Sequence, residues 1–249
     1  MPARIPMTAK QREALLALPM TEEEVIAHHS LDENERAAIA RLRSPANQLG
    51  YALQLCCLRF PGRYLRRGEL LPAIMLDHVA EQIDVDADVI ADFAKRGPTR
   101  YEQLASIKRN HGFVDLTHPV RAELKQWLEA EALSCTDGRL LLERLIARMR
   151  ERKIIIPGVS VIERLTASAM HAADAKVASE ILAQLNTEQK AKLNAVLDDK
   201  THAQQSRLSW LREPPIRVGA RGLFELLDKI DYIRRLGIGE LALPDYLKL

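Results

Sequence analysis

The chain has 249 residues, of which 47% are hydrophobic and 4% aromatic, and its 36 Lys and Arg nearly balance its 34 Asp and Glu. This length suffices for a sizeable core and for one to three globular domains. No run approaches the roughly 18 apolar residues that a membrane span needs, and the N-terminus lacks a signal-peptide core, so we expect an intracellular protein without a membrane partner. The three cysteines, two of them adjacent, indicate buried free thiols rather than a disulfide or a metal site.

Nearly every segment is predicted to be helical, because Leu and Ala are abundant and capping and proline signals recur. We expect one helix to open at Thr21, and further helices over 8–18, 32–42, 44–60, 72–83, 86–96, 99–110, 119–133, 137–152, 160–185, 187–198 and 220–236. The segment KIIIPG (153–158) is β-branched and predicted to be extended. The predicted fold class is all-α and multi-helical, with helix-turn-helix-like DNA-binding units in two or more helical subdomains. The boundaries we predict are 1–114 and 115–249.

The sign of the charge alternates in blocks along the chain. Residues 41–67 carry six arginines and no acid, whereas residues 77–92 carry six acids and no Lys or Arg. Residues 95–111 and 144–164 are again mainly basic. Such blocks could form positive patches for nucleic acid, but in a helical protein opposite blocks could also pair with each other. Charge alone leaves both readings open.

The predicted helix 44–60 has an apolar stripe formed by Leu49, Leu53, Cys56, Cys57 and Phe60. Its other side carries Arg43, Asn47, Tyr51 and Gln54. Asn and Gln pair with adenine and Arg pairs with guanine or phosphate, so this side is typical of a major-groove reader. Flanking phosphates could be held by Arg59, Arg63, Arg66 and Arg67. The alternative is a buried helix whose Asn47 and Gln54 satisfy backbone groups, because Leu55 and Leu58 lie close to the polar side.

Three further basic segments are candidates for DNA contact. In 96–113, Thr99 is predicted to cap a helix with Arg100 in its first turn, where free N–H groups could hold a phosphate. Lys108 and Arg109 end the same helix, where they could equally compensate its dipole. The other candidates are Arg152 and Lys153, in 147–165, and Arg212, in 206–221. Solvated helix ends explain those residues without DNA.

The sequence contains no complete motif for catalysis or metal binding. The acidic run at 84–95 begins like a calcium loop, but Val89 and Lys95 stand where that loop needs Gly and Glu. His28-His29 has no HExxH frame, and GxxxxGK[ST], GxGxxG and GxSxG are absent. We therefore expect no active site and no cofactor in this chain; an enzyme site assembled from scattered acids is a weaker reading.

Five blocks in order carry a resemblance to a known family. They are NQLGYALQLCCLRFPGRYL (47–65), RGPTRYEQLASIKRNHGF (96–113), LIARMRERKIIIPGVSVIERL (145–165), LNTEQKAKLNAVL (185–197) and SRLSWLREPP (206–215). Together they resemble the N-terminal region of TnpA, the large replicative transposase of the Tn-three transposon family. The resemblance covers about 40–249 and is weaker before residue 40.

The resemblance implies that this helical region recognises the terminal inverted repeats of a transposon as double-stranded DNA. In that family a later RNase-H-like domain with an Asp/Asp/Glu triad and Mg²⁺ performs the chemistry, and we expect this chain to stop before it. Residues that match the family blocks are Asn47, Gln48, Arg59, Arg63, Thr99, Arg100, Arg164 and Arg212. The implied location is the bacterial cytoplasm, in association with the nucleoid; self-association in the full transposase stays open.

The rival interpretation is a helical protein-interaction scaffold without DNA specificity. The two interpretations predict different surroundings for Arg43, Arg59, Arg63, Arg100 and Arg109. One continuous positive face would favour DNA, whereas arginines lying over acidic helices would favour the scaffold.

Overall fold

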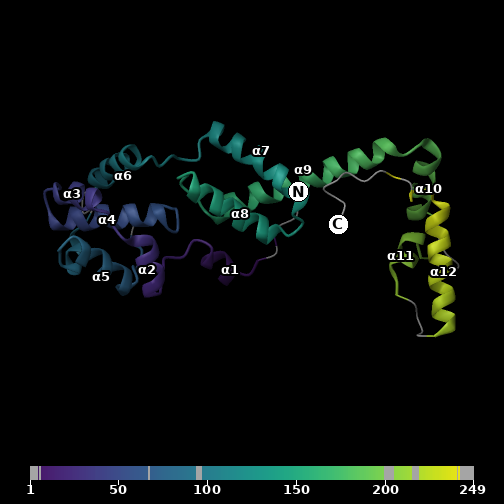
Figure 1. The fold of residues 1–249 in the computed structure, drawn as a ribbon, viewed down its shortest axis with the longest axis horizontal. Coiled ribbons are helices and arrows are strands. Elements are labelled where there is room, and N and C mark those ends of the chain that lie inside the picture. The colour runs from purple at the N-terminus through teal and green to yellow at the C-terminus, as the bar shows by residue number, and fades with distance from the viewer. Residues whose placement is uncertain are drawn as a thin grey trace. The chain divides into compact units, whose positions relative to one another are not determined.

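The computed structural model describes residues 5, 7–66, 68–93, 97–198, 205–214, 219–239 and 241. The regular elements among these residues are helices, so the all-α prediction is confirmed (Figure 1). The chain divides into two compact units, Met1–Ala172 and Ala173–Leu249. The boundary predicted near residue 114 lies inside the first unit. No helix of the described residues is long and apolar enough to cross a membrane. Helix-turn-helix-like units stay a prediction.

Most helix starts agree with the sequence signals. The first unit contains α1 (Ala9–Ala14), α2 (Glu22–His29), α3 (Glu33–Ala40), α4 (Pro45–Arg59), α5 (Ala73–Gln82), the 3-10 helix η1 (Ala87–Asp92), α6 (Gly97–His111), α7 (His118–Ser134), α8 (Gly138–Glu151) and the beginning of α9 (Val159–Gln184). The second unit contains the rest of α9 with α10 (Thr187–Asp198), α11 (Arg207–Arg212) and α12 (Ala220–Arg235). The side chains of Thr8, Asp32, Ser44 and Asp137 cap their helices.

Two expectations about elements are wrong. In place of the helix predicted over 86–96, the structure has the short 3-10 helix η1. Residues 94–96 of the predicted helix lie outside the described part of the chain. Helix α6 begins at Gly97, so Thr99 lies inside it and is not its N-cap. Pro98 is compatible with this start because a helix's first turn needs no N–H donor there. The sequence also gave no separate signal for α11.

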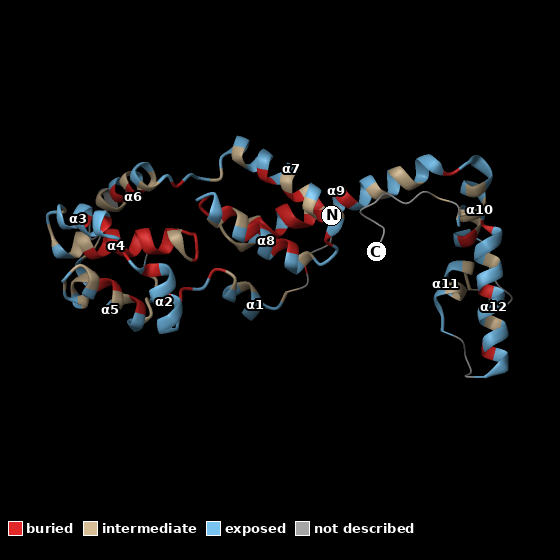
Figure 2. Cartoon of the chain, viewed as in Figure 1, coloured by how far each residue is buried: buried red, intermediate tan, exposed pale blue. Residues whose placement is uncertain are grey.

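Helix α4 forms the centre of the first unit. Every residue from Leu49 to Leu58 is buried, and Leu49, Leu53, Cys56 and Cys57 have no exposed surface. Figure 2 shows the middle of this helix in the colour of burial. Gly50 allows η1 to come close, because a Cβ at that position would lie 2.0 Å from the Phe93 ring. All three cysteines are free and buried, as predicted.

The segment predicted to be extended does join distant parts of the first unit. The backbone N–H of Val114 donates to the carbonyl of Lys153 at 3.0 Å, and that of Ile155 donates to Val114 at 2.8 Å. The N–H of Ile156 donates to the carbonyl of Gly62, also at 2.8 Å. We call this set of backbone bonds the joint. Gly62 and residues 153–156 belong to two of the basic blocks, and Val114 follows the third closely in the chain, so the joint brings the three segments together.

The second unit is organised around α12 and α11. Lys229 is only 5% exposed, and its ammonium donates to the carbonyl of Glu213 at 2.6 Å and pairs with Glu225 at 3.2 Å. It also lies 5.6 Å from the centre of the Trp210 ring, which meets Tyr232 edge to face. A buried lysine with an acid, a carbonyl and an aromatic face is well satisfied, so this contact fastens α12 to α11.

His29 provides a test of the core around α4. Its Nε2 lies 2.8 Å from the carbonyl of Phe60, whereas its Nδ1 is buried without a partner among the described residues. Burial lowers the pKa of His29 in the folded chain. Below about pH 6.5 the unfolded chain therefore binds a proton at this residue more readily than the folded chain does. We expect the free energy of unfolding of the first unit to fall as the pH drops from 7 to 5. The contribution of His29 to this fall is at most about 1.4 kcal/mol per pH unit.

The measurement is urea unfolding of the parent and of His29→Gln across this pH range. Glutamine cannot titrate, so the variant's free energy of unfolding should fall less steeply than the parent's. Equal slopes would contradict a depressed His29 pKa. His111, whose pKa is also lowered by burial, is present in both proteins and cancels in the comparison.

Candidate nucleic-acid interface

The polar side of α4 is largely buried rather than open to a DNA groove. Tyr51 and Gln54 are 5% and 1% exposed, which corrects the expectation that both face outward. The Gln54 amide donates to Gln103 Oε1 at 2.9 Å, and the Gln103 amide donates to the carbonyl of Asn47 at 3.1 Å. Gln48 is also engaged, since its amide donates to the carbonyl of Leu42 at 2.9 Å. The buried-helix alternative therefore describes the middle of α4.

Two of the arginines expected to hold phosphates are instead paired within the protein. Arg59 pairs with Glu35 and donates to the carbonyl of Ser30 at 2.8 Å. Arg63 is 6% exposed and forms two bonds to Glu69, at 2.9 and 2.5 Å. A buried bidentate pair satisfies a guanidinium, so Arg63 is not available to DNA in this conformation. The side chain of Arg59 keeps 28% of its surface exposed, but its charge is already compensated by Glu35.

Other predicted contacts are also engaged with the protein. Arg100 donates to the carbonyl of Leu65, and Lys108 donates to Asp115 at 2.8 Å. That bond raises the pKa of Lys108. The remaining engaged residues are Arg152, paired with Glu123 at 2.8 Å, and Arg164, bonded to the carbonyl of Ser160 at 3.3 Å. Thr99 is half-buried in α6, and Arg67 lies outside the described residues.

Several predicted cations do remain exposed and without an acid. Among the described residues these are Arg43, Arg109, Lys153 and Arg212; Arg66 is exposed too, but its charge and its backbone N–H both act on Glu69. Arg43 directly precedes the N-cap of α4, and Asn47, in its first turn, is half-buried rather than buried. Arg212 ends α11 in the second unit. The arginines therefore do not decide between the DNA and the scaffold interpretations. Arg59 and Arg63 have acidic partners, while Arg43 and Arg109 have none among the described residues.

The joint places the exposed Lys153 of one basic block beside the end of α6, which belongs to another. The Lys153 ammonium donates to the carbonyl of His111, at the end of α6, at 3.0 Å. His111 lies within reach of Arg59 as well, and its Nδ1 is 3.6 Å from Glu35 Oε1. Burial lowers the pKa of His111 first, and the charges of Arg59 and Lys153 lower it further. The sequence indicated that basic residues end α6, but not that Lys153 would join them.

This α6 end is not uniformly positive. Glu35 Oε1 lies 3.6 Å from His111 Nδ1, and the negative charge of Asp32 opposes the lowering of the pKa of both Arg59 and His111. The C-terminal carbonyls of α6 also disfavour an anion. Arg109 and Lys153 are the exposed cations near this end of α6 that have no acidic partner among the described residues. Among the residues with a described position, no group of three or more His, Cys, Asp or Glu could hold a metal ion.

Comparison with known proteins gives a consistent result. Residues 7–169 match the family described as domain of unknown function DUF4158. The chain is 30% identical over 230 residues to the transposase for transposon Tn21 of Escherichia coli, which covers 92% of this chain and 23% of that relative. It is 30% identical over all 249 residues to the transposase for Tn2501 of Escherichia coli, and 28% identical over 240 residues to that for Tn501 of Pseudomonas aeruginosa. For these two the alignment covers 100% and 96% of this chain but 24% of each relative, so the chain spans about a quarter of their length.

The Gln54–Gln103 pair allows structural and base-reading roles to be separated. Gln54→Leu leaves the Gln103 carbonyl oxygen buried and unpaired, which should cost about 1–3 kcal/mol of stability. The double variant Gln54→Leu/Gln103→Leu removes both partners and should recover most of this loss. Chemical denaturation of the four proteins in the cycle gives the coupling. A single variant of parental stability that nevertheless binds DNA less selectively would assign Gln54 to a base.

Proposed function

Because the chain belongs to the family described as domain of unknown function DUF4158 and is homologous to bacterial transposases, we propose that it binds the terminal inverted repeats of a transposon. The observation that carries this proposal is the extent of the match, which includes 92–100% of the chain for the Tn21 and Tn2501 transposases. Both units are therefore part of the homologous region. In this proposal the chain acts in transposition as the N-terminal module of a transposase.

Affinity in this proposal comes from phosphate contacts by exposed cations that have no acidic partner among the described residues. Arg43, Arg109 and Lys153 supply them in the first unit, and Arg212 supplies one in the second. Each contact releases counterions from DNA, so binding should weaken as salt rises. Arg66 is exposed as well, but it stands on the rim of an apolar groove described below.

Sequence choice in this proposal is assigned to the first turn of α4. Arg43 and Asn47 flank the Ser44 cap, and both are at least partly exposed. A helix N-terminus attracts phosphate through its free N–H groups, and Asn and Arg can then reach base edges. The buried middle of α4 fixes the orientation of this turn, because its side chains pack on every neighbouring helix of the core.

The remaining parts of the reaction are assigned outside this chain. We place DNA cleavage and joining, with Mg²⁺, in an RNase-H-like domain elsewhere in the transposase, and we assign no cofactor to this chain. Double-stranded DNA in the bacterial cytoplasm and nucleoid is the proposed partner, and self-association belongs to the full transposase. The scaffold alternative gains from Arg59 and Arg63, whose acidic partners compensate charge inside the protein.

Arg43→Ala and Arg109→Ala test the phosphate contacts. Each change should weaken binding to any duplex and reduce the salt dependence of the binding constant by about one unit. Neither side chain has a partner among the described residues, so stability should change by less than about 0.5 kcal/mol. Binding is measured by fluorescence anisotropy across a salt series.

Arg139→Ala is the matched control. Arg139 is exposed on α8 and pairs with Glu143 at 2.9 Å, so its removal should leave DNA binding unchanged. If all three variants bind with the parent's affinity and salt slope, Arg43 and Arg109 do not hold phosphates. If the control weakens binding as much as they do, the effect is one of net charge alone.

A further inference from the structure

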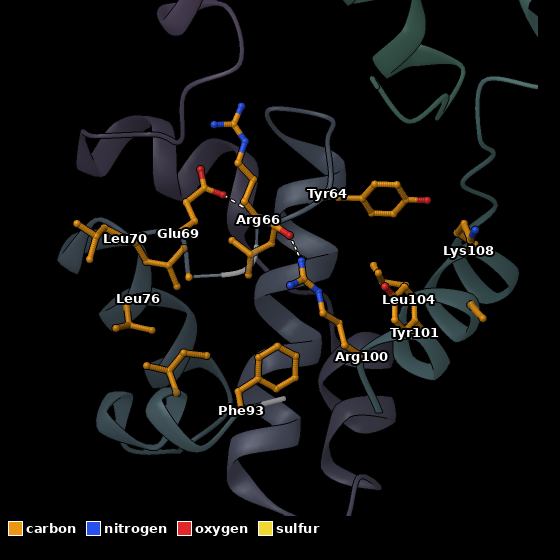
Figure 3. Close-up of a pocket in the computed structure, with 15 residues that line it drawn as sticks. Tyr64, Arg66, Glu69, Leu70, Leu76, Phe93, Arg100, Tyr101, Leu104 and Lys108 are labelled. Atoms are coloured by element: carbon orange, nitrogen blue, oxygen red, sulfur yellow. Dashed lines mark hydrogen bonds between the residues drawn. The ribbon is translucent and has the colours of Figure 1, made fainter. Parts of the chain in front are cut away.

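The first unit contains a large apolar groove that the DNA proposal does not use. It has a volume of about 1130 Å³ and lies between the loop after Tyr64, α5, η1 and α6 (Figure 3). Its apolar lining comprises Leu65, Leu70, Leu71, Leu76, Ile90, Phe93 and Leu104. Two large side chains at its edge are unusually open, since Leu70 is 94% and Tyr101 is 75% exposed. Exposed apolar surface of this kind marks a binding surface more often than a solvated one.

The charges that surround the groove are unbalanced. Arg66, Arg100 and Lys108 line it together with Glu69. Glu69 is neutralised by Arg63, and Lys108 by Asp115. Counting these residues and their partners, four cations face two carboxylates among the described residues, which leaves a charge of +2.

Arg100 adds a specific unmet requirement. Its half-buried side chain reaches into the groove and donates to the carbonyl of Leu65, and no carboxylate of the described part of the chain is paired with it (Figure 3). A guanidinium has five N–H donors in a fixed fork, and it matches a carboxylate with two parallel bonds. A ligand that carries a carboxylate beside apolar groups would therefore satisfy both Arg100 and the floor of the groove.

We propose that this groove binds an amphipathic protein helix whose apolar stripe is flanked by acidic residues. The stripe would lie on Leu70, Leu76, Phe93 and Leu104 while acids beside it meet Arg66 and Arg100. Helices bind in grooves through apolar anchors spaced at i, i+3, i+4 and i+7, which suits a floor built from three helices and a loop. The partner is thus a protein segment of acidic amphipathic character, separate from the DNA.

Other occupants fit the groove less well. Its volume exceeds the roughly 300–1,000 Å³ of most small-molecule sites. Duplex DNA presents phosphates and polar base edges, which would meet the cations but leave the apolar floor in contact with water. Only a segment with both apolar and acidic side chains complements the whole surface.

The test uses a fluorescein-labelled synthetic helix of about 15 residues, near the shortest length that forms a helix alone in water. It carries leucines at the groove-binding spacing and glutamates on both flanks. Two control peptides have lysine in place of glutamate, or the same residues in scrambled order. Anisotropy without DNA should show saturable binding of the acidic helix, about tenfold tighter than either control. Equal binding of the three peptides would overturn the proposal.

Variants of the protein locate the binding. Leu70→Glu and Tyr101→Glu change exposed side chains, so the fold should survive, and circular dichroism checks this. Each should weaken peptide binding by about tenfold or more. Leu140→Glu, on α8 and 43% exposed, is the matched control and should bind as the parent does. Unchanged peptide binding in Leu70→Glu and Tyr101→Glu, or a loss of duplex binding instead, would overturn the assignment of this groove to a protein helix.

Discussion

The first unit depends on the joint, in which the extended residues 154–156 bond to Val114 and to Gly62. Three buried isoleucines in a row, Ile154, Ile155 and Ile156, make this segment apolar enough to leave the surface and β-branched enough to resist helix. Arg150 reinforces it, because its Nε donates to the carbonyl of Pro61 at 2.9 Å and its guanidinium lies 4.4 Å from the centre of the Phe60 ring. These bonds hold together the segments that follow α4 and α6 and the segment that precedes α9.

The joint also explains why the arginines divide into two groups. Arginines beside loops, such as Arg63 and Arg150, donate to backbone carbonyls of those loops. Such charged hydrogen bonds stabilise irregular backbone. Those on helix ends, such as Arg43 and Arg109, have no such loop to hold and stay in solvent. Some arginines of the basic blocks therefore stabilise the fold, and only the second group is left for the phosphate contacts that we propose. In the groove, Arg100 is intermediate, bonded to one carbonyl but left without an acid.

The sequence predicted the helices well because their signals are local. Ser44-Pro45, Asp32 and Asp137 each start a helix through a cap that needs only neighbouring residues. The apolar stripe of α4 was also readable, but the burial of its polar side was not, because it depends on Gln103, 49 residues beyond Gln54 in the chain. The pairing of Arg59 with Glu35 and of Lys108 with Asp115 likewise depends on packing. The groove had no sequence signal, since its lining comes from one loop and three separate helices.

The central claim is that this region recognises a transposon end, and it is tested most directly by comparing two duplexes of equal length. One carries the terminal inverted repeat of the transposon that encodes the chain, and the other carries the same bases scrambled. Binding of the parent chain to each is measured by anisotropy from low to physiological salt. The account predicts tighter binding to the true repeat that persists at physiological salt, because base contacts survive where phosphate attraction is screened. Equal binding to both duplexes, lost as salt rises, would contradict it.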